Sequence, residues 1–440
     1  MRYVLKLAAS IGAASLGFVI ASISTAASAE TVVIQDAKIH TVAGNNSARV
    51  IEDGDIIVRD GHIVSVGRNL SAPEGATVIS ANGRVVTPGI IAPWSQLGLV
   101  EIGLDREAND ASTRDGFELS AALDAVDGYN SSSTLIPINR SGGITRALSA
   151  PTAGDKMFGG QAALIDLSGK PDSVMQAKIA QSVVIGYGGA RRNGDSRLAA
   201  YAVLRETLDE ARAYATSPHE YLRRNIDDRF EVADLKALGP VVDGDQLLIV
   251  SVDSASEIRN VIRLKNEYDL NIAILGGSEA WKVGAALAAA DIPVILNPLA
   301  NLPSQFEDLG ATLENAARLH RARVKISFYG PPSGTHNLRF LTQLAGNAVS
   351  YGLPYAEGIA ALTRNPAELL GVGDKLGSIG VGKIADLVIW DGDPLEVTSR
   401  PVGVLINGQI MDMSNRQTIL RDRYKDLERG DLPFAYRGAE

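Results

Sequence analysis

Residues 376–391 read LGSIGVGKIADLVIWD, and this stretch decides how the rest of the chain is interpreted. Its three glycines precede a mostly apolar run over 385–390, which is typical of a loop that leads into a buried strand. Asp391-Gly392 is a turn signal, and a further apolar run over 402–406 ends at Asn407-Gly408. The pattern predicts a hairpin close to the end of the chain.

The same alternation of short strands and turns fills the beginning of the chain. Asp53-Gly54, Asp60-Gly61 and Asn82-Gly83 separate apolar runs within residues 30–86. Because two strand-rich ends enclose a middle of different character, we expect one small β-sandwich built from both ends. Residues 30–86 form its first part and residues 373–412 its second part.

The middle of the chain, residues 87–372, alternates apolar runs with helical patterns such as 255–268 and 355–362. This repetition predicts an α/β fold with a parallel sheet, and a (β/α)8 barrel of the TIM type suits 440 residues best. An open doubly wound sheet often carries a glycine-rich phosphate loop after its first strand, which is not found here. The strand candidates are 85–92, 143–147, 162–165, 246–252, 271–275, 293–296 and 324–328.

Both termini differ from the body of the chain. Arg2 and Lys6 flank an apolar run that ends in Ala27-Ser28-Ala29, a pattern that predicts a secretory signal peptide over residues 1–29. A retained membrane anchor is the alternative. We therefore expect an exported protein, periplasmic or extracellular. Residues 413–440 are polar, and they predict an exposed helix with a tail or, alternatively, a partner-binding arm.

Composition excludes several classes of function. Removing two basic residues with the signal peptide changes the formal net charge from −9 to −11, so nucleic acid is not an expected partner. The absence of cysteine excludes disulfides, thiolate nucleophiles and sulfur-ligated zinc. A small-molecule ligand or substrate remains the expected partner, with no membrane span after signal removal. A homo-oligomer or a hetero-oligomer with a relative stays open.

Three stretches, in their order along the chain, resemble the amidohydrolase superfamily, and within it the imidazolonepropionase-like hydrolases. They are 56–67, followed by a Pro-Gly step at 88–89, then 363–371, and then 376–391. The resemblance covers about residues 31 to 410. It implies a metal-hydrolase barrel with a small β-sandwich, and hydrolysis of C–N bonds other than peptide bonds with zinc or another divalent metal.

The metal-binding motif is where the chain departs from this family. The family's first barrel strand carries an aspartate and two histidines, and the matching positions here are Ala92, Trp94 and Gln96. Ser251 and Gly276-Gly277 stand where later histidines are expected, and the usual aspartate after 324–328 has no counterpart. An indole offers no lone pair to a metal, and an amide oxygen is a poor zinc ligand.

The number and spacing of the histidines also argue against a metal site. The whole chain has five, without His-x-His or His-x-x-x-His spacing: His40, His62, His219, His320 and His336. We therefore predict no metal site and no cofactor. A site made only of carboxylates, which would take Mg²⁺ or Ca²⁺, is the alternative.

The ligand site is expected at the C-terminal ends of the barrel strands. The predicted pocket residues are Trp94, Gln96, Ser251 and Asn297. We expect Trp94 to fill the vacated metal pocket rather than bind a substrate ring. The other three have an alternative role as hydrogen-bonded polar groups at strand ends.

No catalytic residue is assigned, but three candidates exist for acid–base chemistry: Asp253, Glu279 and His336. Each has a structural alternative. Asp253 would cap the helix that starts near Ala255, Glu279 would complement a helix dipole, and His336 would be a solvated loop histidine. The glycine-rich segment 185–194 lacks the spacing of a phosphate loop and is expected to be a loop near the barrel mouth.

The sequence thus predicts an exported amidohydrolase-like protein whose catalysis is weak or absent. General base catalysis alone contributes only about 10²- to 10⁴-fold, so a metal-free version of the family reaction would be slow. One alternative is an active metal-dependent amidohydrolase or peptidase-like hydrolase with ligands that remain unplaced. The other is a non-catalytic binding or assembly subunit.

Overall fold

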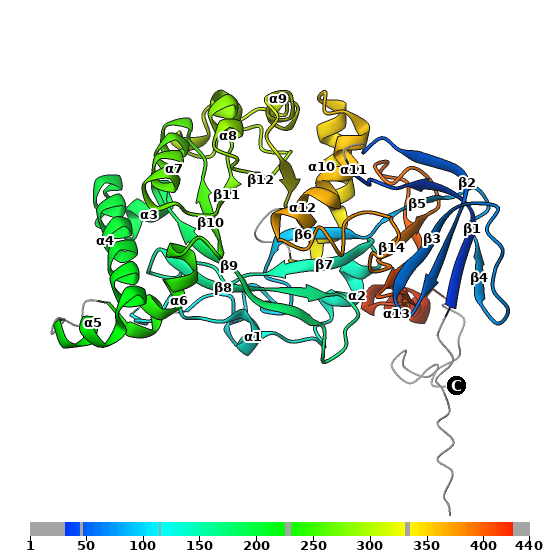
Figure 1. Ribbon diagram of the computed structural model, residues 1–440, viewed down its shortest axis with the longest axis horizontal. Helices are drawn as coiled ribbons and strands as arrows, with labels where there is room; N and C mark the ends of the chain where they lie inside the picture. The colour runs from blue at the N-terminus through cyan, green and yellow to red at the C-terminus, as the bar shows by residue number, and fades with distance from the viewer. Residues whose placement is uncertain (1–30, 45–46, 114–115, 225–229, 331–334, 426–440) are drawn as a thin grey trace, which may run out of the picture.

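The computed structural model describes residues 31–44, 47–113, 116–224, 230–330 and 335–425 (Figure 1). The predicted signal peptide and the last residues of the predicted tail lie outside these ranges. Two mixed sheets of eight strands each organise the described chain. One forms a barrel surrounded by helices, and the other forms a strand-rich domain beside it (Figure 1).

The strand-rich domain joins both ends of the chain, as predicted. Its order is β16-β15-β14-β5-β1-β2-β3, and β4 and β5 pair with the two halves of one edge of β1. Its core includes Ile34, Ile56 and Leu387. The strands are β1 (Thr31–His40), β2 (Val50–Arg59), β3 (His62–Arg68), β4 (Thr77–Ser80), β5 (Val85–Pro88), β14 (Leu387–Trp390), β15 (Pro401–Ile406) and β16 (Gln409–Ile410).

The second sheet is a nearly closed barrel, which confirms the predicted fold class. The expectation of parallel pairing is wrong at one strand, because β8 runs antiparallel to both β7 and β9. Short connections without crossover helices join these three strands, and such connections require antiparallel pairing. The strands are β6 (Ile90–Ser95), β7 (Ile144–Ser149), β8 (Phe158–Asp166), β9 (Val174–Val184), β10 (Leu247–Val252), β11 (Ile272–Gly276), β12 (Val294–Leu296) and β13 (Ile326–Phe328).

Helices cover the outside of the barrel (Figure 1). The predicted bounds of α7 and α11 are confirmed, whereas the loop expected over 185–194 is wrong because its first half forms α3. The α-helices are α1 (Ala125–Gly128), α2 (Leu135–Arg140), α3 (Gly186–Arg191), α4 (Arg197–Thr216), α5 (Pro218–Arg224), α6 (Val232–Val242), α7 (Ala255–Tyr268), α8 (Gly284–Ala289), α9 (Asn315–Arg321), α10 (Leu341–Ser350), α11 (Tyr355–Leu362), α12 (Arg364–Leu369) and α13 (Arg416–Tyr424). The 3-10 helices are η1 (Arg106–Ala108), η2 (Ala280–Val283), η3 (Phe306–Asp308) and η4 (Thr335–Phe340).

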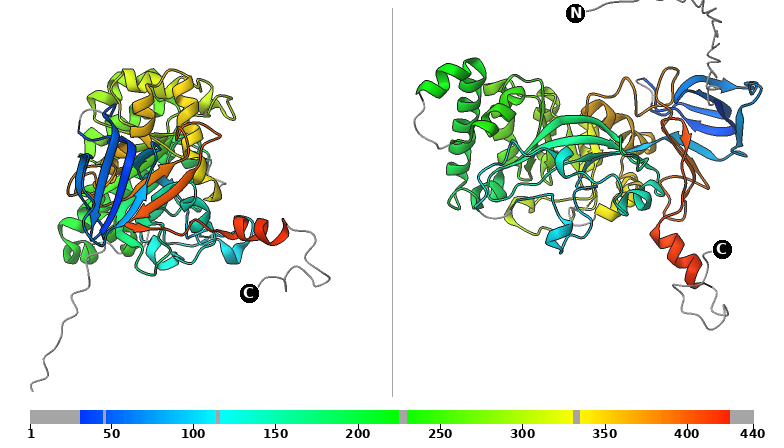
Figure 2. Two further views of the ribbon diagram at one scale, coloured as in Figure 1. Left: turned by 90° about the vertical axis from the view of Figure 1, so that its right-hand side faces the viewer. Right: turned by 90° about the horizontal axis from the view of Figure 1, so that it is seen from below.

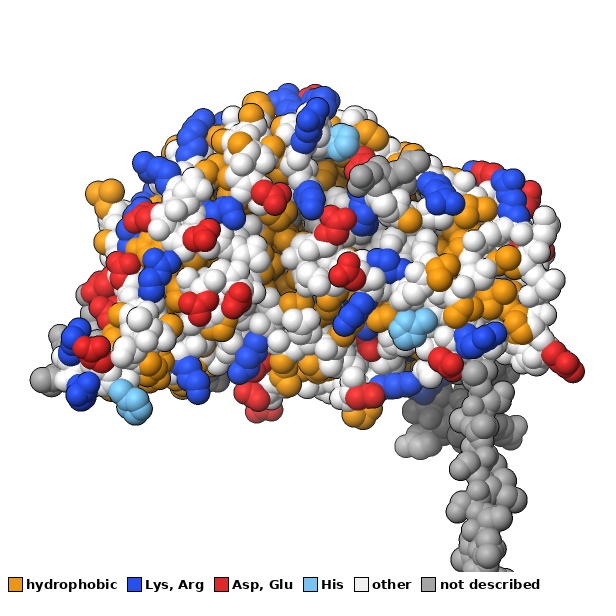
Figure 3. Space-filling model, in the orientation of Figure 1, with side chains coloured by type: hydrophobic (Ala, Val, Ile, Leu, Met, Phe, Trp, Pro, Cys, Tyr) orange, Lys and Arg blue, Asp and Glu red, His pale blue; other side chains and the backbone are white. Residues whose placement is uncertain are grey.

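The helix α13 follows the strand-rich domain and lies outside the body of the molecule (Figure 2). All of its side chains are at least partly exposed. Across the described ranges, no helix combines the length and the apolar character needed to cross a bilayer. On the face seen in Figure 3, acidic and basic side chains are interspersed.

The chain passes from the strand-rich domain to the barrel at Gly89. The single strand predicted over 85–92 is divided there, because β5 pairs with β14 and β6 pairs with β7. A Cβ atom at Gly89 would lie 2.2 Å from Thr145 Oγ1, so only glycine fits this close approach. The Gly89 N–H donates to the Asp386 carbonyl at 2.8 Å.

A buried arginine joins the two sheets. Arg146 of β7 is 2% exposed, and its Nε and Nη2 donate to the two carboxylate oxygens of Asp386 at 2.7 and 3.0 Å. Nη2 also donates to Asn407 Oδ1 at 2.6 Å, and Asn407 Nδ2 donates to Asp166 of β8. Such paired, charge-assisted bonds fix geometry as well as charge. We call Arg146, Asp386, Asn407 and Asp166 the seam cluster.

Replacing Arg146 by alanine is expected to destabilise the protein by about 3–5 kcal/mol, because the Asp386 carboxylate would remain buried without its cation. Chemical unfolding of both proteins measures the difference. Lys156→Ala is the matched control, since its ion pair with Glu118 is exposed and contributes less than about 1 kcal/mol. Equal losses for the two variants would contradict the role assigned to the seam cluster.

Candidate functional site

The barrel mouth contains a cavity of about 740 Å³. It is lined by residues that follow β6, β7 and β13, including Gln96, Thr152 and His336. These are the C-terminal ends of the strands, where barrel proteins place their ligand sites. The cavity therefore lies where the sequence predicted a site, and it brings Gln96 and His336 to the same space.

The walls of this cavity are largely aliphatic, with contributions from Val100, Ile102, Leu104, Ala111 and Leu135. The described residues that line it include no lysine or arginine. Its acidic side chain, Glu101, already accepts hydrogen bonds from the Ser133 and Thr134 hydroxyls and from the Thr134 N–H. An anionic ligand would thus enter an apolar space without a counter-charge.

Gln96 is the lining residue with unused hydrogen-bonding capacity. Its side chain is 7% exposed, and its Nε2 is buried with no partner among the described residues. Buried amides nearly always form hydrogen bonds, so an unpaired one requires an explanation. His336 lies at the same cavity and is exposed, but the expectation of a loop histidine is wrong because it belongs to the 3-10 helix η4.

Trp94 faces a different environment. Its side chain is 8% exposed and belongs to the cluster inside the barrel, with Ile91, Leu148, Ile249 and Leu275. Alternate residues of the barrel strands point into this interior, so the cluster fills the barrel. The indole therefore packs against aliphatic side chains where the family keeps its first metal-binding histidine.

The other two predicted pocket residues lie on different strands. Ser251 is partly exposed near the end of β10, in phase with Leu247 and Ile249 of the interior cluster. Asn297 follows β12, and its Oδ1 accepts a hydrogen bond from the Leu299 N–H at 3.0 Å. Neither lines the cavity that contains Gln96, and Asn297 stabilises a turn.

The suggested helix cap at Asp253 is wrong, because Ser254 caps α7 and accepts a hydrogen bond from the Glu257 N–H. Asp253 Oδ1 instead accepts from the Ser278 hydroxyl at 2.7 Å and from the Ser278 N–H at 3.0 Å. Burial raises the pKa of Asp253 above its ordinary value, and these hydrogen bonds oppose that effect. Its carboxylate joins the ends of two neighbouring strands.

Glu279 is buried, and both of its carboxylate oxygens accept hydrogen bonds. Its Oε2 accepts from the Ala255 N–H at 3.1 Å, and its Oε1 accepts from the Gly310 N–H at 2.8 Å and from Lys282 Nζ at 2.6 Å. Burial alone would raise its pKa, but these three donors together lower the pKa below its ordinary value. Asp253 and Glu279 are absent from the lining of the cavity that contains His336, so that cavity does not bring the three acid–base candidates together.

Sequence reasoning missed two buried acids that share a partly exposed arginine at the ends of β9, β10 and β12. Glu257 of α7 and Glu307 of η3 are 4% and 6% exposed, and both lie next to Arg197 at the start of α4. The only local signal was Ser254-x-x-Glu257, which reads as an ordinary helix start. We call Glu257, Glu307 and Arg197 the carboxylate triad.

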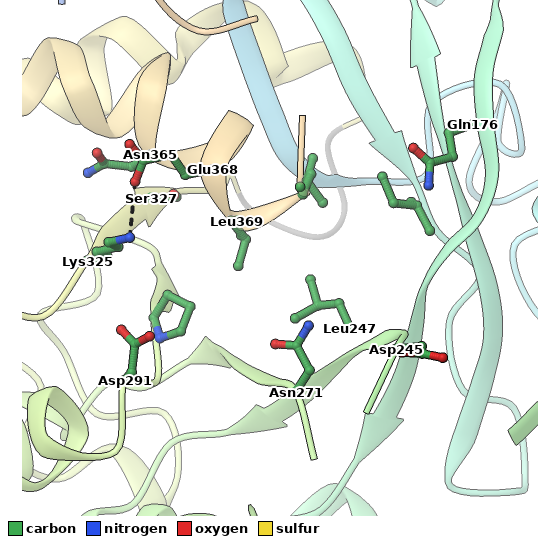
Figure 4. Close-up of a pocket in the computed structure, with 14 residues that line it drawn as sticks. Gln176, Asp245, Leu247, Asn271, Asp291, Lys325, Ser327, Asn365, Glu368 and Leu369 are labelled. Atoms are coloured by element: carbon green, nitrogen blue, oxygen red, sulfur yellow. Dashed lines mark ion pairs between the residues drawn. The ribbon is translucent and has the colours of Figure 1, made fainter. Parts of the chain in front are cut away.

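The opposite end of the barrel carries a smaller, polar hollow of about 330 Å³ (Figure 4). It lies at the N-terminal ends of β10 to β13, with Asp245, Asn271 and Asp291 around it. Lys325 Nζ and Glu368 Oε2 form an ion pair there at 3.1 Å. The N-terminal face of such barrels serves stability, so we assign the site to the other end.

The residues present do not fit the family's metal. Within the described ranges, no three or more His, Asp or Glu side chains converge in a way that could hold an ion. The histidines are dispersed: His40 contacts Tyr355, His62 begins β3, and His320 lies on α9. At the family's positions stand an alanine, a buried indole and an amide, which do not supply zinc ligands.

A barrel with a joined strand-rich domain and a cavity at its strand ends is the architecture that the family resemblance implied. A model of the amidohydrolase family matches residues 285–419. Imidazolonepropionase of Sphingopyxis alaskensis is 25% identical over 83% of this chain and 93% of its own length. Amidohydrolase tasK of Hapsidospora irregularis is 26% identical over 81% of this chain, but the match spans only 39% of that protein.

A solved structure agrees with these relatives. The amidohydrolase from Thermotoga maritima is 25% identical, with a TM-score of 0.77 over 87% of this chain and 99% of its own. The chain therefore belongs to the amidohydrolase superfamily, which confirms the resemblance carried by residues 376–391.

Glu279→Gln is expected to lower the free energy of unfolding by about 1–3 kcal/mol at neutral pH, because a buried, charge-assisted network loses its anion. Since the pKa of Glu279 is lowered, its stabilising effect exists above the ordinary value of 4.5 and disappears as the pH falls below it. The difference between wild type and variant should thus shrink in acid. A difference that stays constant down to strongly acidic pH would contradict this assignment.

Proposed function

We propose that this protein is an amidohydrolase-like small-molecule binding protein, in which the family's metal site is lost and C–N bond hydrolysis is weak or absent. The observation that carries this proposal is the cavity at the barrel mouth. It is lined by Gln96, which stands at the position of a family histidine and whose buried Nε2 has no hydrogen-bond partner among the described residues. The predicted signal peptide supports a further proposal, that the protein acts in the periplasm or outside the cell.

The chemistry of the cavity suggests its ligand. Aliphatic walls favour an apolar body, and a cavity of about 740 Å³ is in the range of small-molecule sites. A primary amide offers one donor group and one acceptor, so Gln96 suits an uncharged ligand with a carbonyl or amide group. Because the described lining holds Glu101 and no basic side chain, we propose a neutral rather than an anionic ligand.

The relatives bear the names amidohydrolase and imidazolonepropionase, which supports an origin in C–N bond hydrolysis. Family members activate water with a metal ion, and the residues at the corresponding positions here do not fit one. No reaction step is therefore assigned through a metal. His336 is the titratable side chain at the cavity rim that remains available for weak general base catalysis.

Fluorescence titration with a neutral apolar probe, N-phenyl-1-naphthylamine, tests this proposal. We expect saturable binding, and at least about tenfold weaker binding of the anionic probe 8-anilinonaphthalene-1-sulfonate, because the anion finds no counter-charge. Ser112→Trp should abolish the neutral probe's binding, since Ser112 lines the cavity and a ring would fill it.

The matched control is Ser71→Trp, at an exposed position between β3 and β4, which should bind the probe like the wild type. Preference for the anionic probe, or unchanged binding to Ser112→Trp, would reject the cavity as the ligand site.

A further inference from the structure

The loop over residues 297–314 joins β12 to α9 (Figure 1). Its side chains have the reverse of the usual arrangement. Leu302 and Phe306 are 83% and 88% exposed, whereas Glu307 and Asp308 are only 6% and 9% exposed. In η3 the buried residues are both acids. Burial of apolar surface therefore does not hold this part of the loop against the barrel.

The carboxylate triad provides an attachment instead. Arg197 Nη2 donates to Glu307 Oε1 at 2.6 Å, and the Tyr187 N–H also donates to the Glu307 carboxylate. Arg197 Nε lies 3.1 Å from Glu307 Oε1 and 3.2 Å from Glu257 Oε1. The loop is thus tied to the starts of α4 and α7 through one guanidinium.

The chain turns closely around the two acids at Gly186. Its φ is +68°, and a Cβ atom there would lie 3.0 Å from Glu307 Oε2 and 3.1 Å from Glu257 Oε2. Glycine permits both the left-handed conformation and the close approach. Both carboxylates are consequently enclosed between Gly186, α4, α7 and η3.

The charges of the triad balance only when one proton is present. Two ionised acids with one arginine leave a net negative charge, whereas a neutral Glu257 can donate a hydrogen bond to an ionised Glu307. The other ionisable groups acting on these acids are Tyr201 of α4, on Glu257, and Asp253 after β10, whose carboxylate interacts with Glu307 and Asp308. They add no positive charge to the triad.

We propose that the carboxylate triad is a proton-dependent latch, which holds the 297–314 loop against the barrel mouth when Glu257 is protonated and releases it when both acids are ionised. The latch belongs to the fold itself and does not depend on the ligand proposed above. Release of the loop would make the exposed apolar side chains Leu302 and Phe306 mobile at the rim of the barrel.

The pH dependence of loop closure follows from the pKa of Glu257 in the closed and in the open state of the loop. In the closed state, burial and the contact with Glu307 raise the pKa of Glu257 to about 7, while a solvated Glu257 in the open state has the ordinary value of 4.5. The closed state is thus favoured at low pH, and this advantage is lost as the pH rises from 4.5 through about 7. Glu307 shows the opposite shift, with a lowered pKa, because it accepts hydrogen bonds from Glu257, Tyr187 and Arg197.

Hydrogen–deuterium exchange of the full chain tests the latch. Exchange rates of peptides within residues 297–314, corrected for the intrinsic effect of pH, should rise about tenfold or more between about pH 5 and about pH 8.5. Peptides from α10 serve as an internal reference and should not change after the same correction. Equal protection of the loop at both pH values would overturn the proposal.

Glu257→Gln keeps the size and a hydrogen-bond donor but removes the titration, so the loop of this variant should stay protected at both pH values. Glu314→Gln is the matched control, because Glu314 lies in the same segment and forms an exposed pair with Arg318. It should retain the wild-type pH response. A Glu257→Gln variant that also retains that response would overturn the proposal.

A measurement on the wild type alone guards against a variant that fails to fold. The Trp281 indole donates to the Gly310 carbonyl at 2.8 Å, so its fluorescence reports on the end of the loop. We expect a reversible change in tryptophan emission with a midpoint near neutral pH. Emission that stays constant between about pH 5 and about pH 8.5 would count against the latch.

Discussion

The bidentate pair between Arg146 and Asp386 is the interaction on which the arrangement of the two sheets depends. It joins a barrel strand to the residue that begins the return into the strand-rich domain, and both side chains are buried. A buried pair of this kind is stabilising only when its remaining donors and acceptors are satisfied. Asn407 and Asp166 satisfy them, so the seam cluster acts as one unit. The path of the chain into β6, and with it the position of Gln96, follows from this seam.

Inside the barrel, apolar side chains pack around Trp94, the position that matches the family's first metal-binding histidine. Trp94 lies among aliphatic side chains from several strands, and together they form a buried apolar cluster. A large ring fills such a space well, which makes the interior stable without an ion. The proposed binding site is the cavity at the strand ends, where Gln96 Nε2 has no hydrogen-bond partner among the described residues and the walls are aliphatic. We therefore assign stability of the interior to Trp94 within β6 and the proposed binding to Gln96, which directly follows that strand.

Much of this fold could be predicted from local patterns. Residues 376–391 predicted the return strand correctly because its glycines, its apolar run and its turn all act locally. The apolar run over 162–165 was predicted correctly as a strand, β8, but its antiparallel direction was not, since an isolated apolar run does not reveal the direction of its neighbours. Asp253 and Ser254 are adjacent polar residues, and only the backbone conformation decides which of them caps α7. Sequence alone cannot pair Glu257 with Glu307, because the barrel brings together acids that lie on separate connections.

The central claim is that side chains, and no transition metal, occupy the centre of this barrel. Crystals grown with zinc or manganese and measured at the absorption edge of each metal would test it most directly. The account predicts no anomalous peak in the interior beside Trp94. A strong peak there, held by side chains of the barrel strands, would contradict it and would restore the metal-dependent chemistry of the family.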